Sequence, residues 1–246
     1  SFVVATSAGQ DLQILDVAVS YADNDNCVVR SDLEIDKSST EELAGKKVAV
    51  PLGTAAHYGF LKQMDHFGVD VGSMEIVDMD PPDGAAAIAQ GAVDMFCGWG
   101  GSLRRAKEHG NILLTGAEKT ELGILVFDVT SGPAGWVAEN SDLVAKFLKV
   151  TADANAMWAD SSNHAMMLPA IAKDAGMDEA ATADTMATFV FPTVDSQLSS
   201  TWLGGGAQEF MKGVADVFVT AGSIDSALGS YADNVNVGPL ETANGM

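Results

Sequence analysis

The chain has 246 residues, of which 47% are hydrophobic and 19% are charged. This composition excludes a disordered polyampholyte and allows a core in one large domain or two smaller lobes. The 34 acidic and 13 basic residues give a formal net charge of −21, which disfavours nucleic acid and anionic membranes as partners. No apolar run approaches the roughly 18 residues of a membrane-spanning helix.

The first half of the chain alternates between strand-like and helix-like patterns. We expect strands at 14–20, 27–30, 47–50, 74–79, 93–99, 112–114 and 124–129. Helices are expected at 55–67, 81–90 and 102–108. This alternation predicts a mostly parallel sheet flanked by helices.

From Ser141 onward the pattern becomes helical. Helices are expected at 143–160, 165–175, 179–189 and 203–221. Turns at Gly176, Pro192 and Gly222 separate them. The chain therefore divides into an α/β part and a helical layer.

Two cysteines, Cys27 and Cys97, lie in apolar runs. Two buried free thiols are the simpler interpretation, and one disulfide between them is the alternative. The histidines show neither helical i,i+4 pairing nor a cysteine partner at zinc spacing, so no metal site is expected.

The segment Thr54-Ala55-Ala56-His57 lies where a strand and its loop lead into a helix. Unpaired amides at a helix start bind anions, small residues allow close approach, and the Thr54 hydroxyl adds a donor. By itself the pattern favours an ordinary threonine N-cap, which is the usual role of threonine at this position. His57 is either a donor to the anion or a helix residue without a ligand.

Two further residues follow predicted strands. Trp99 is flanked by glycines at the carboxyl end of a strand, where ligands bind in open α/β sheets. Core packing is the alternative for its indole. Pro82 opens a helix that could add amides to the site, although a plain proline-started helix is the favoured interpretation.

Two acidic residues are candidates for contact with a ligand. Asp128 interrupts an apolar strand, where a carboxylate needs a partner: either a ligand or backbone amides at a hinge. Asp25 lies in a polar segment that interrupts the first expected strand and is the weaker candidate.

The order of segments resembles the taurine and aliphatic-sulfonate solute-binding proteins of ABC importers. The resemblance is carried by LAGKKVAVP at 43–51, TAAHY at 54–58, EIVD at 75–78, DPP at 80–82, GAVD at 91–94 with Trp99, and VFDV at 126–129. Each motif alone is unspecific, but their order and spacing cover nearly the whole chain. After Asp128 the segment Gly132-Pro-Ala-Gly departs from the family pattern. The second of the two segments that connect the lobes in this family is therefore expected to differ in shape.

The resemblance implies a type II periplasmic-binding-protein fold, in which two α/β lobes enclose a ligand cleft. Residues 1–22 would be the remnant of an incomplete first lobe, 23–128 the second lobe, and 129–246 the return to the first lobe with the helical layer. Ser1 would end a turn whose amides help to hold the anion. The rest of that lobe and a signal peptide would lie upstream.

The function implied is capture of a small sulfonate by a monomeric, cofactor-free periplasmic protein that delivers it to a permease. The sulfonate would meet Ser1, Thr54, Ala55, Ala56, His57, Pro82 and Trp99. The ammonium group of taurine would meet Asp128, with Asp25 second. Alternatives are a same-fold protein for nitrate, an amino acid or a pyrimidine, a thiamine-pyrimidine biosynthesis enzyme, or the sensing domain of a regulator. Cys97 is the one plausible nucleophile for an enzyme, and its apolar context argues for an inert thiol.

Overall fold

The computed structural model describes residues 2–246, and Ser1 lies outside the described part. The chain forms two compact units. The first comprises the segment up to Tyr21, Phe127–Glu209 and Ser230–Met246, and the second comprises Ala22–Val126 and Phe210–Gly229. Each unit is described by itself, and the lobe boundaries expected from the sequence stay a prediction.

The second unit is built on a five-stranded sheet in the order β4-β3-β5-β2-β6. Its strands are β2 (Asp25–Arg30), β3 (Lys47–Val50), β4 (Glu75–Asp78), β5 (Met95–Trp99) and β6 (Gly110–Ile112). β3 pairs in parallel with β4 and β5, whereas β2 pairs antiparallel with β5 and β6. Because β5 and β6 both oppose β2, four strands share one direction and β2 alone is reversed. The expected mostly parallel sheet is therefore present, with one reversed strand.

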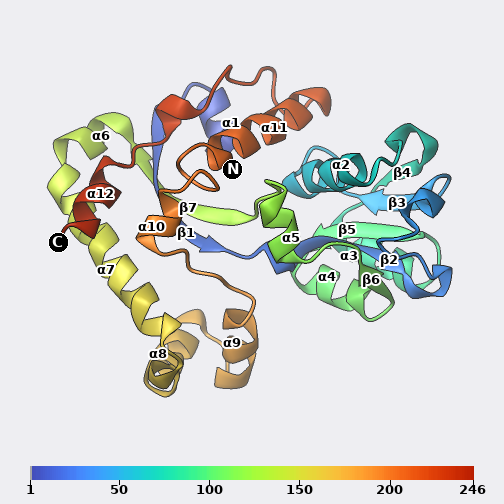
Figure 1. Cartoon of the computed structure of the whole chain (residues 1–246), viewed down its shortest axis with the longest axis horizontal. Coiled ribbons are helices and arrows are strands. Elements are labelled where there is room, and N and C mark those ends of the chain that lie inside the picture. Colours follow the sequence, from blue (N-terminus) through green and yellow to red (C-terminus); the bar gives the residue numbers. More distant parts are fainter. Residues whose placement is uncertain (1) are drawn as a thin grey trace. The chain divides into compact units, whose positions relative to one another are not determined.

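Helices cover both faces of this sheet (Figure 1). α2 (Ala55–Phe67) packs Phe60 and Met64 onto the face that carries Val48 and Cys97. α3 (Pro81–Ala89) and α4 (Gly100–Lys107) cover the opposite face, around Phe96. The alternation of strand side chains between two faces separates these two apolar clusters.

Cys27 and Cys97 form a disulfide, which corrects the expectation of two free thiols. β2 and β5 run antiparallel in a register that sets these two residues directly opposite each other. Their apolar surroundings were inferred correctly, since both are fully buried. The register of two strands that lie 70 positions apart in sequence is a tertiary feature, so it cannot be predicted from local apolar patterns.

The first unit contains a two-stranded antiparallel sheet of β1 (Leu12–Ser20) and β7 (Phe127–Pro133). β7 begins at Phe127, later than the strand expected at 124–129. Ile124 and Leu125 are buried, but they lie in the connection that follows α5 (Gly116–Glu121) of the second unit. The helices of this unit are α1 (Phe2–Ser7), α6 (Ala134–Glu139), α7 (Ser141–Ala159), α8 (His164–Ala175), α9 (Glu179–Met186), α10 (Val194–Gln197) and α12 (Gly238–Asn244). A further helix, α11 (Gly206–Thr220), begins in the first unit and lies mostly in the second. The short helices α1, α5, α6, α10 and α12 were not expected, since six or seven residues or fewer carry little periodic signal.

Candidate functional site

The carboxyl ends of β3, β4 and β5 lie at one edge of the sheet in the second unit, because these strands are parallel and adjacent. β2 is reversed, so its first residue, Asp25, lies at the same edge, directly opposite Trp99 at the end of β5. α2 follows β3 and α3 follows β4, so both helices begin there as well. The structure thus brings together the predicted residues of this unit: Thr54, Ala55, Ala56, His57, Pro82, Trp99 and Asp25.

Thr54 is the N-cap of α2. Its Oγ1 accepts a hydrogen bond from the His57 amide at 3.2 Å and donates one to the Pro51 carbonyl at 2.7 Å. The hydroxyl proton is therefore already used, so Thr54 does not supply the free donor that the sequence suggested. The amides of Ala55 and Ala56 have no acceptor within residues 2–246. They are the unpaired donors of a helix start, at the positive end of its dipole.

His57 lies in the first turn of α2, half-buried. Its Nδ1 accepts a hydrogen bond from the Gly53 amide at 3.3 Å, which leaves the proton of the neutral ring on Nε2. Burial lowers the pKa of His57 below its ordinary value, and the nearby Asp78 carboxylate partly opposes this effect. His57 is therefore a neutral N–H donor at physiological pH. Gly53 has a φ of 68°, a conformation that favours glycine and turns its amide toward the ring.

Asp25 begins β2 in a desolvated environment. Burial raises the pKa of its carboxyl to about 6, although the positive charge of Lys119 opposes the shift. The Lys119 ammonium donates to the main-chain carbonyl of Asp25, and the carboxylate has no hydrogen bond or ion pair within residues 2–246. Lys119 itself is almost completely buried, and burial lowers its pKa to about 8. Sequence analysis missed this lysine because it lies in a short helix.

Trp99 is the last residue of β5 and is 41% exposed. The alternative of core packing is therefore wrong for this indole. No ring contact or hydrogen bond engages its side chain within the described residues. The glycines that follow it in α4 leave its flank open.

Pro82 lies at the exposed start of α3. Pro81 and Pro82 have no amide proton, and the next two amides, of Asp83 and Gly84, both donate to the Asp80 carbonyl. The start of α3 therefore offers no free amide at these positions. Pro82 can line the edge of the sheet but cannot add a donor to it.

Two predicted site residues, Asp128 and Ser1, do not belong to the second unit. Asp128 is exposed on β7 of the first unit, and its Oδ1 accepts a hydrogen bond from the Tyr21 hydroxyl at 3.2 Å. The expected partner is thus a tyrosine rather than backbone amides. Ser1 lies outside the described residues.

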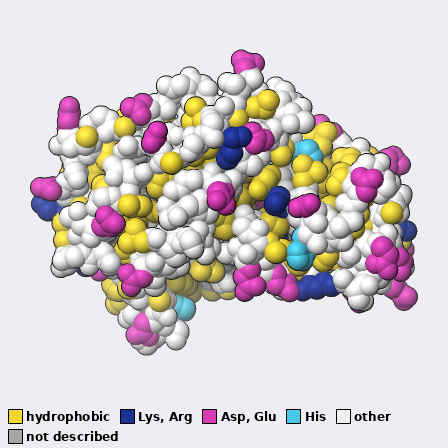
Figure 2. All heavy atoms as spheres, turned by 45° about the horizontal axis from the view of Figure 1, so that its top comes forward, with side chains coloured by type: hydrophobic (Ala, Val, Ile, Leu, Met, Phe, Trp, Pro, Cys, Tyr) yellow, Lys and Arg dark blue, Asp and Glu magenta, His cyan; other side chains and the backbone are white. Residues whose placement is uncertain are grey.

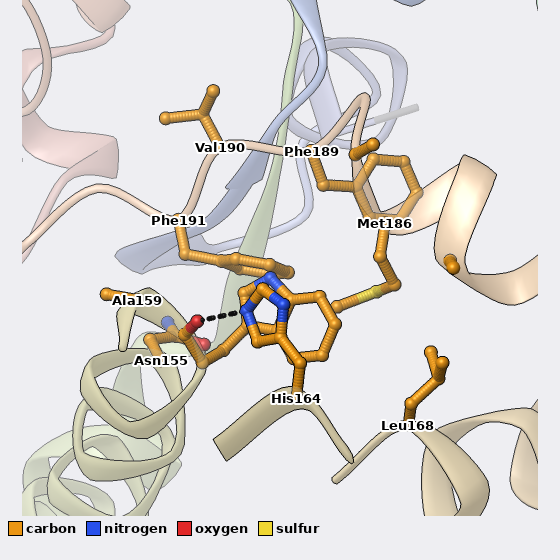
Figure 3. Close-up of a pocket in the computed structure, with 11 residues that line it drawn as sticks. Asn155, Ala159, His164, Leu168, Met186, Phe189, Val190 and Phe191 are labelled. Atoms are coloured by element: carbon orange, nitrogen blue, oxygen red, sulfur yellow. Dashed lines mark hydrogen bonds between the residues drawn. The ribbon is translucent and has the colours of Figure 1, made fainter. Parts of the chain in front are cut away.

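The first unit holds a pocket of about 440 Å³ that sequence analysis did not predict (Figure 3). Trp158 and His164 stack with ring centroids 3.9 Å apart, and His164 Nε2 bonds the Trp158 carbonyl at 2.8 Å. The remaining lining residues are mainly apolar, among them Leu168, Met186 and Phe191. No lysine or arginine lines this pocket, so its chemistry does not suit a small strong acid.

The acidic residues are spread over the visible face of the molecule, with few basic ones between them (Figure 2). No group of three or more potential metal ligands is clustered within residues 2–246. In the same part of the chain, no helix combines the length and apolar character that crossing a bilayer requires.

Comparison with known proteins gives matches of sequence and of fold. Residues 2–165 match the family model described as "NMT1/THI5 like". The taurine-binding periplasmic protein of Escherichia coli is 26% identical over 151 residues, which cover 61% of this chain and 46% of that protein. The chain thus spans about half the length of this curated relative.

Two crystal structures share the fold. A periplasmic sulfonate-binding protein from Methylobacillus flagellatus superposes with a TM-score of 0.72 at 17% identity, covering 98% of this chain and 71% of that one. The periplasmic aliphatic sulphonate-binding protein of Escherichia coli gives a TM-score of 0.68 at 18% identity, covering 92% and 70%. These matches confirm the expected α/β fold of the type II periplasmic binding proteins and the suspected resemblance to taurine- and sulfonate-binding proteins. Because the family model matches 2–165, well over half of its residues, the chain belongs to the NMT1/THI5-like family.

Proposed function

We propose that the protein is the solute-binding component of an ABC importer, that it captures a small sulfonate at the start of α2, and that it delivers this solute to a membrane permease. The observation that carries the proposal is the pair of unpaired amides of Ala55 and Ala56. The Thr54 cap holds the first turn in place, and the neutral His57 ring adds a third donor nearby.

The chemistry of a sulfonate suits such a site. A sulfonate remains ionised at physiological pH and accepts hydrogen bonds on three oxygens, so it needs donors and no proton transfer. Main-chain amides at a helix start supply donors together with the positive end of the helix dipole. The net charge of −21 gives an overall field that opposes anion capture. Local donors must therefore provide the attraction.

Removal of a single amide tests the proposal. Ala55 is the first residue of α2, where proline fits the helix and only the N–H is lost. Thr54 has φ −120° and ψ 168°, the extended conformation that a residue before proline prefers. The variant Ala55→Pro should keep its fold and lose about tenfold or more of its affinity for ethanesulfonate, measured by calorimetry.

The matched control is Glu179→Pro. Glu179 is the first residue of α9 in the first unit, and its N-cap Asp178 is also extended, with φ −74° and ψ 158°. This variant should bind ethanesulfonate like the parent protein. Equal affinity of Ala55→Pro and the parent, or no sulfonate binding by the parent, would refute the proposed site.

The periplasm is the proposed compartment. Structural disulfides persist in oxidising compartments such as the periplasm and are rare in the cytosol. The buried Cys27–Cys97 bond supports this proposal, as does the similarity to periplasmic taurine- and sulfonate-binding proteins. The permease partner is proposed from the same relatives.

A biosynthetic enzyme on this fold is the alternative function. Its most plausible nucleophile in this sequence was Cys97, which is consumed by the disulfide. No free cysteine remains within the described residues. No specific observation at the sheet edge favours a covalent mechanism over simple binding.

A further inference from the structure

The pocket of the first unit is bounded by segments that the structure holds in place. Its walls are the end of α7, the start of α8, α9, and the connection 189–191 that follows α9. This connection is tied to the end of β1, because Ser20 and Val190 each donate an amide to the other's carbonyl at 2.7 Å. α8 packs against α9. The pocket therefore lies between packed helices and an anchored strand-like segment.

A hydrogen-bonded turn joins α7 to α8 at one side of the pocket. Asn163 Nδ2 donates to the Met157 carbonyl at 2.9 Å, and His164 Nε2 donates to the Trp158 carbonyl at 2.8 Å. Both carbonyls lie in the last turn of α7, where they have no partner within the helix. The His164 ring lies flat on Trp158, with 14° between the two ring planes. The turn thus fixes the orientation of both rings.

Three residues that line the pocket carry polar groups without a protein partner. Because the Nε2 proton of His164 is used by the Trp158 carbonyl, Nδ1 of the neutral ring is an acceptor. This Nδ1, the indole N–H of Trp158 and the side-chain amide of Asn155 form no hydrogen bond within residues 2–246. A ligand in the pocket would therefore find both acceptors and donors.

The charges around the pocket favour a neutral ligand. No aspartate, glutamate, lysine or arginine is among the lining residues. Asp160 interacts electrostatically with His164, but its carboxylate is exposed and already accepts a hydrogen bond from the Ser162 amide at 2.9 Å. A charged ligand would lose hydration in this pocket without gaining an ion pair.

The walls are aromatic and apolar. Figure 3 shows Phe191, Met186 and Leu168 around the His164 ring. Aromatic rings pack best against other rings, in offset or edge-to-face arrangements. The volume of about 440 Å³ lies within the range of roughly 300–1,000 Å³ that small-molecule sites occupy. The shape and lining therefore suit a small planar ring system.

We propose that this pocket is a second binding site, which takes a small, neutral, planar aromatic molecule that carries an N–H or O–H donor. The ring of the ligand packs against the aromatic walls, and its donor bonds His164 Nδ1 or the Asn155 oxygen. A mainly apolar lining with a few polar groups that fix orientation is typical of such sites. All the lining residues belong to the first unit, whereas Ala55 and Ala56 belong to the second, so the inference does not depend on sulfonate capture.

Indole and benzofuran are the matched probes, because benzofuran has an oxygen in place of the N–H in the same bicyclic shape. Calorimetry is run at pH 8, where an ordinary imidazole is neutral. The parent protein should bind both probes and should bind indole about fivefold or more tightly than benzofuran. Saturating ethanesulfonate should not displace indole.

Three variants separate the walls from the acceptor. Trp158→Leu removes an aromatic wall and should weaken both probes by about tenfold or more. His164→Phe keeps a ring on Trp158 but lacks Nδ1, so benzofuran should bind within about twofold of the parent and the preference for indole should vanish. Trp136→Leu is the matched control, because Trp136 is an exposed tryptophan of α6 that does not line the pocket. It should change neither affinity.

The side-chain N–H resonances of the four tryptophans locate the bound probe. Indole should shift the resonance of Trp158 most, and those of Trp99, Trp136 and Trp202 little. The proposal is overturned if the parent protein binds neither probe, or if it binds both equally. Displacement of indole by ethanesulfonate, or a largest shift on Trp99, would place the probe in the second unit and overturn it as well. If His164→Phe keeps the preference for indole, His164 only caps α7 and the assigned acceptor is wrong.

Discussion

The Gly53 amide donates to His57 Nδ1 across 3.3 Å, and this bond fixes the tautomer of a histidine at the start of α2. Since Nδ1 accepts, the proton of the neutral ring lies on Nε2. Burial, the larger influence, also holds the pKa of His57 below the ordinary value of 6.5.

His57 should therefore remain neutral in the free protein down to pH values below 6.5. Nitrogen-detected NMR of the imidazole should show the Nε2–H form at pH 7 and a titration midpoint below that of an exposed histidine. A midpoint for His57 at or above 6.5 would contradict the effect of burial, and an Nδ1–H tautomer would contradict the bond from Gly53.

Loss of the Thr54 cap should reduce stability. Thr54→Ala frees the His57 amide and removes the N-cap, which costs about 1 kcal/mol in the free energy of unfolding. Thr54→Ser keeps Oγ and should restore most of this loss in urea denaturation. If serine and alanine destabilise the protein equally, the methyl group of Thr54 matters rather than its hydroxyl.

The stability of the protein should depend on pH through Asp25. Its pKa is raised in the folded state, from 3.8 to about 6. A raised folded pKa contributes stability that is complete below 3.8 and is lost as the pH rises through about 6. Above pH 6 the ionised carboxylate therefore opposes folding.

Asp25→Asn should consequently raise the free energy of unfolding at pH 7.5 by about 1–2 kcal/mol, and the gain should shrink toward pH 4. Urea titrations at several pH values measure this difference. A variant that is more stable yet binds taurine less tightly is the expected signature of a binding residue. A variant that is destabilised at pH 7.5 would show that Asp25 is structural.

Taurine affinity tests the sequence prediction that Asp25 contacts the solute, and it should share this pH dependence. The ammonium of taurine stays protonated across pH 5–8, as a primary amine with a pKa of about 10 does. Protonation of Asp25 below about pH 6 should therefore weaken taurine. Lys119, with a pKa of about 8, and its neighbours Asp23 and Lys107 are the other charges near this group. Ethanesulfonate affinity, measured in parallel, should not fall as the pH is lowered, because protonation of His57 can only add attraction for the sulfonate.

Reduction of the Cys27–Cys97 bond should destabilise the protein. The bond closes a loop across 70 positions of sequence, and such bonds contribute roughly 2–4 kcal/mol to the free energy of unfolding. Thermal unfolding with and without reductant, compared with a Cys27→Ala/Cys97→Ala variant, measures this contribution. Because the parent bond is buried, reductant should act slowly below the unfolding transition. Rapid reduction of the folded protein would contradict this burial.

Local patterns predicted the elements that place the site. The helix at 55–67 and the strand at 47–50 have the predicted bounds, because a threonine cap, a glycine stop and apolar periodicity all agree there. The same segments place Ala55 and Ala56 at a helix start. Short helices such as α5 were not predicted, and the burial of Lys119 in α5 was therefore not predicted either.

Pairing across the sheet could not be predicted from local patterns. The reversed direction of β2 sets Asp25 beside Trp99 and Cys27 beside Cys97, and strand direction is a property of the assembled sheet. The sequence favoured Asp128 over Asp25 because Asp128 interrupts an apolar strand and matches the acidic residue of the family's strand motif. The apolar neighbours of Asp128 suggested a buried carboxylate, whereas Asp128 is exposed on β7.

The most direct test of the account is an amide-detected NMR titration of the protein with ethanesulfonate. The account predicts that the largest shift changes fall on the amides of Ala55 and Ala56, with the His57 ring next. Changes centred on Trp158 and His164 of the other pocket, or none at α2 under saturating ligand, would contradict it.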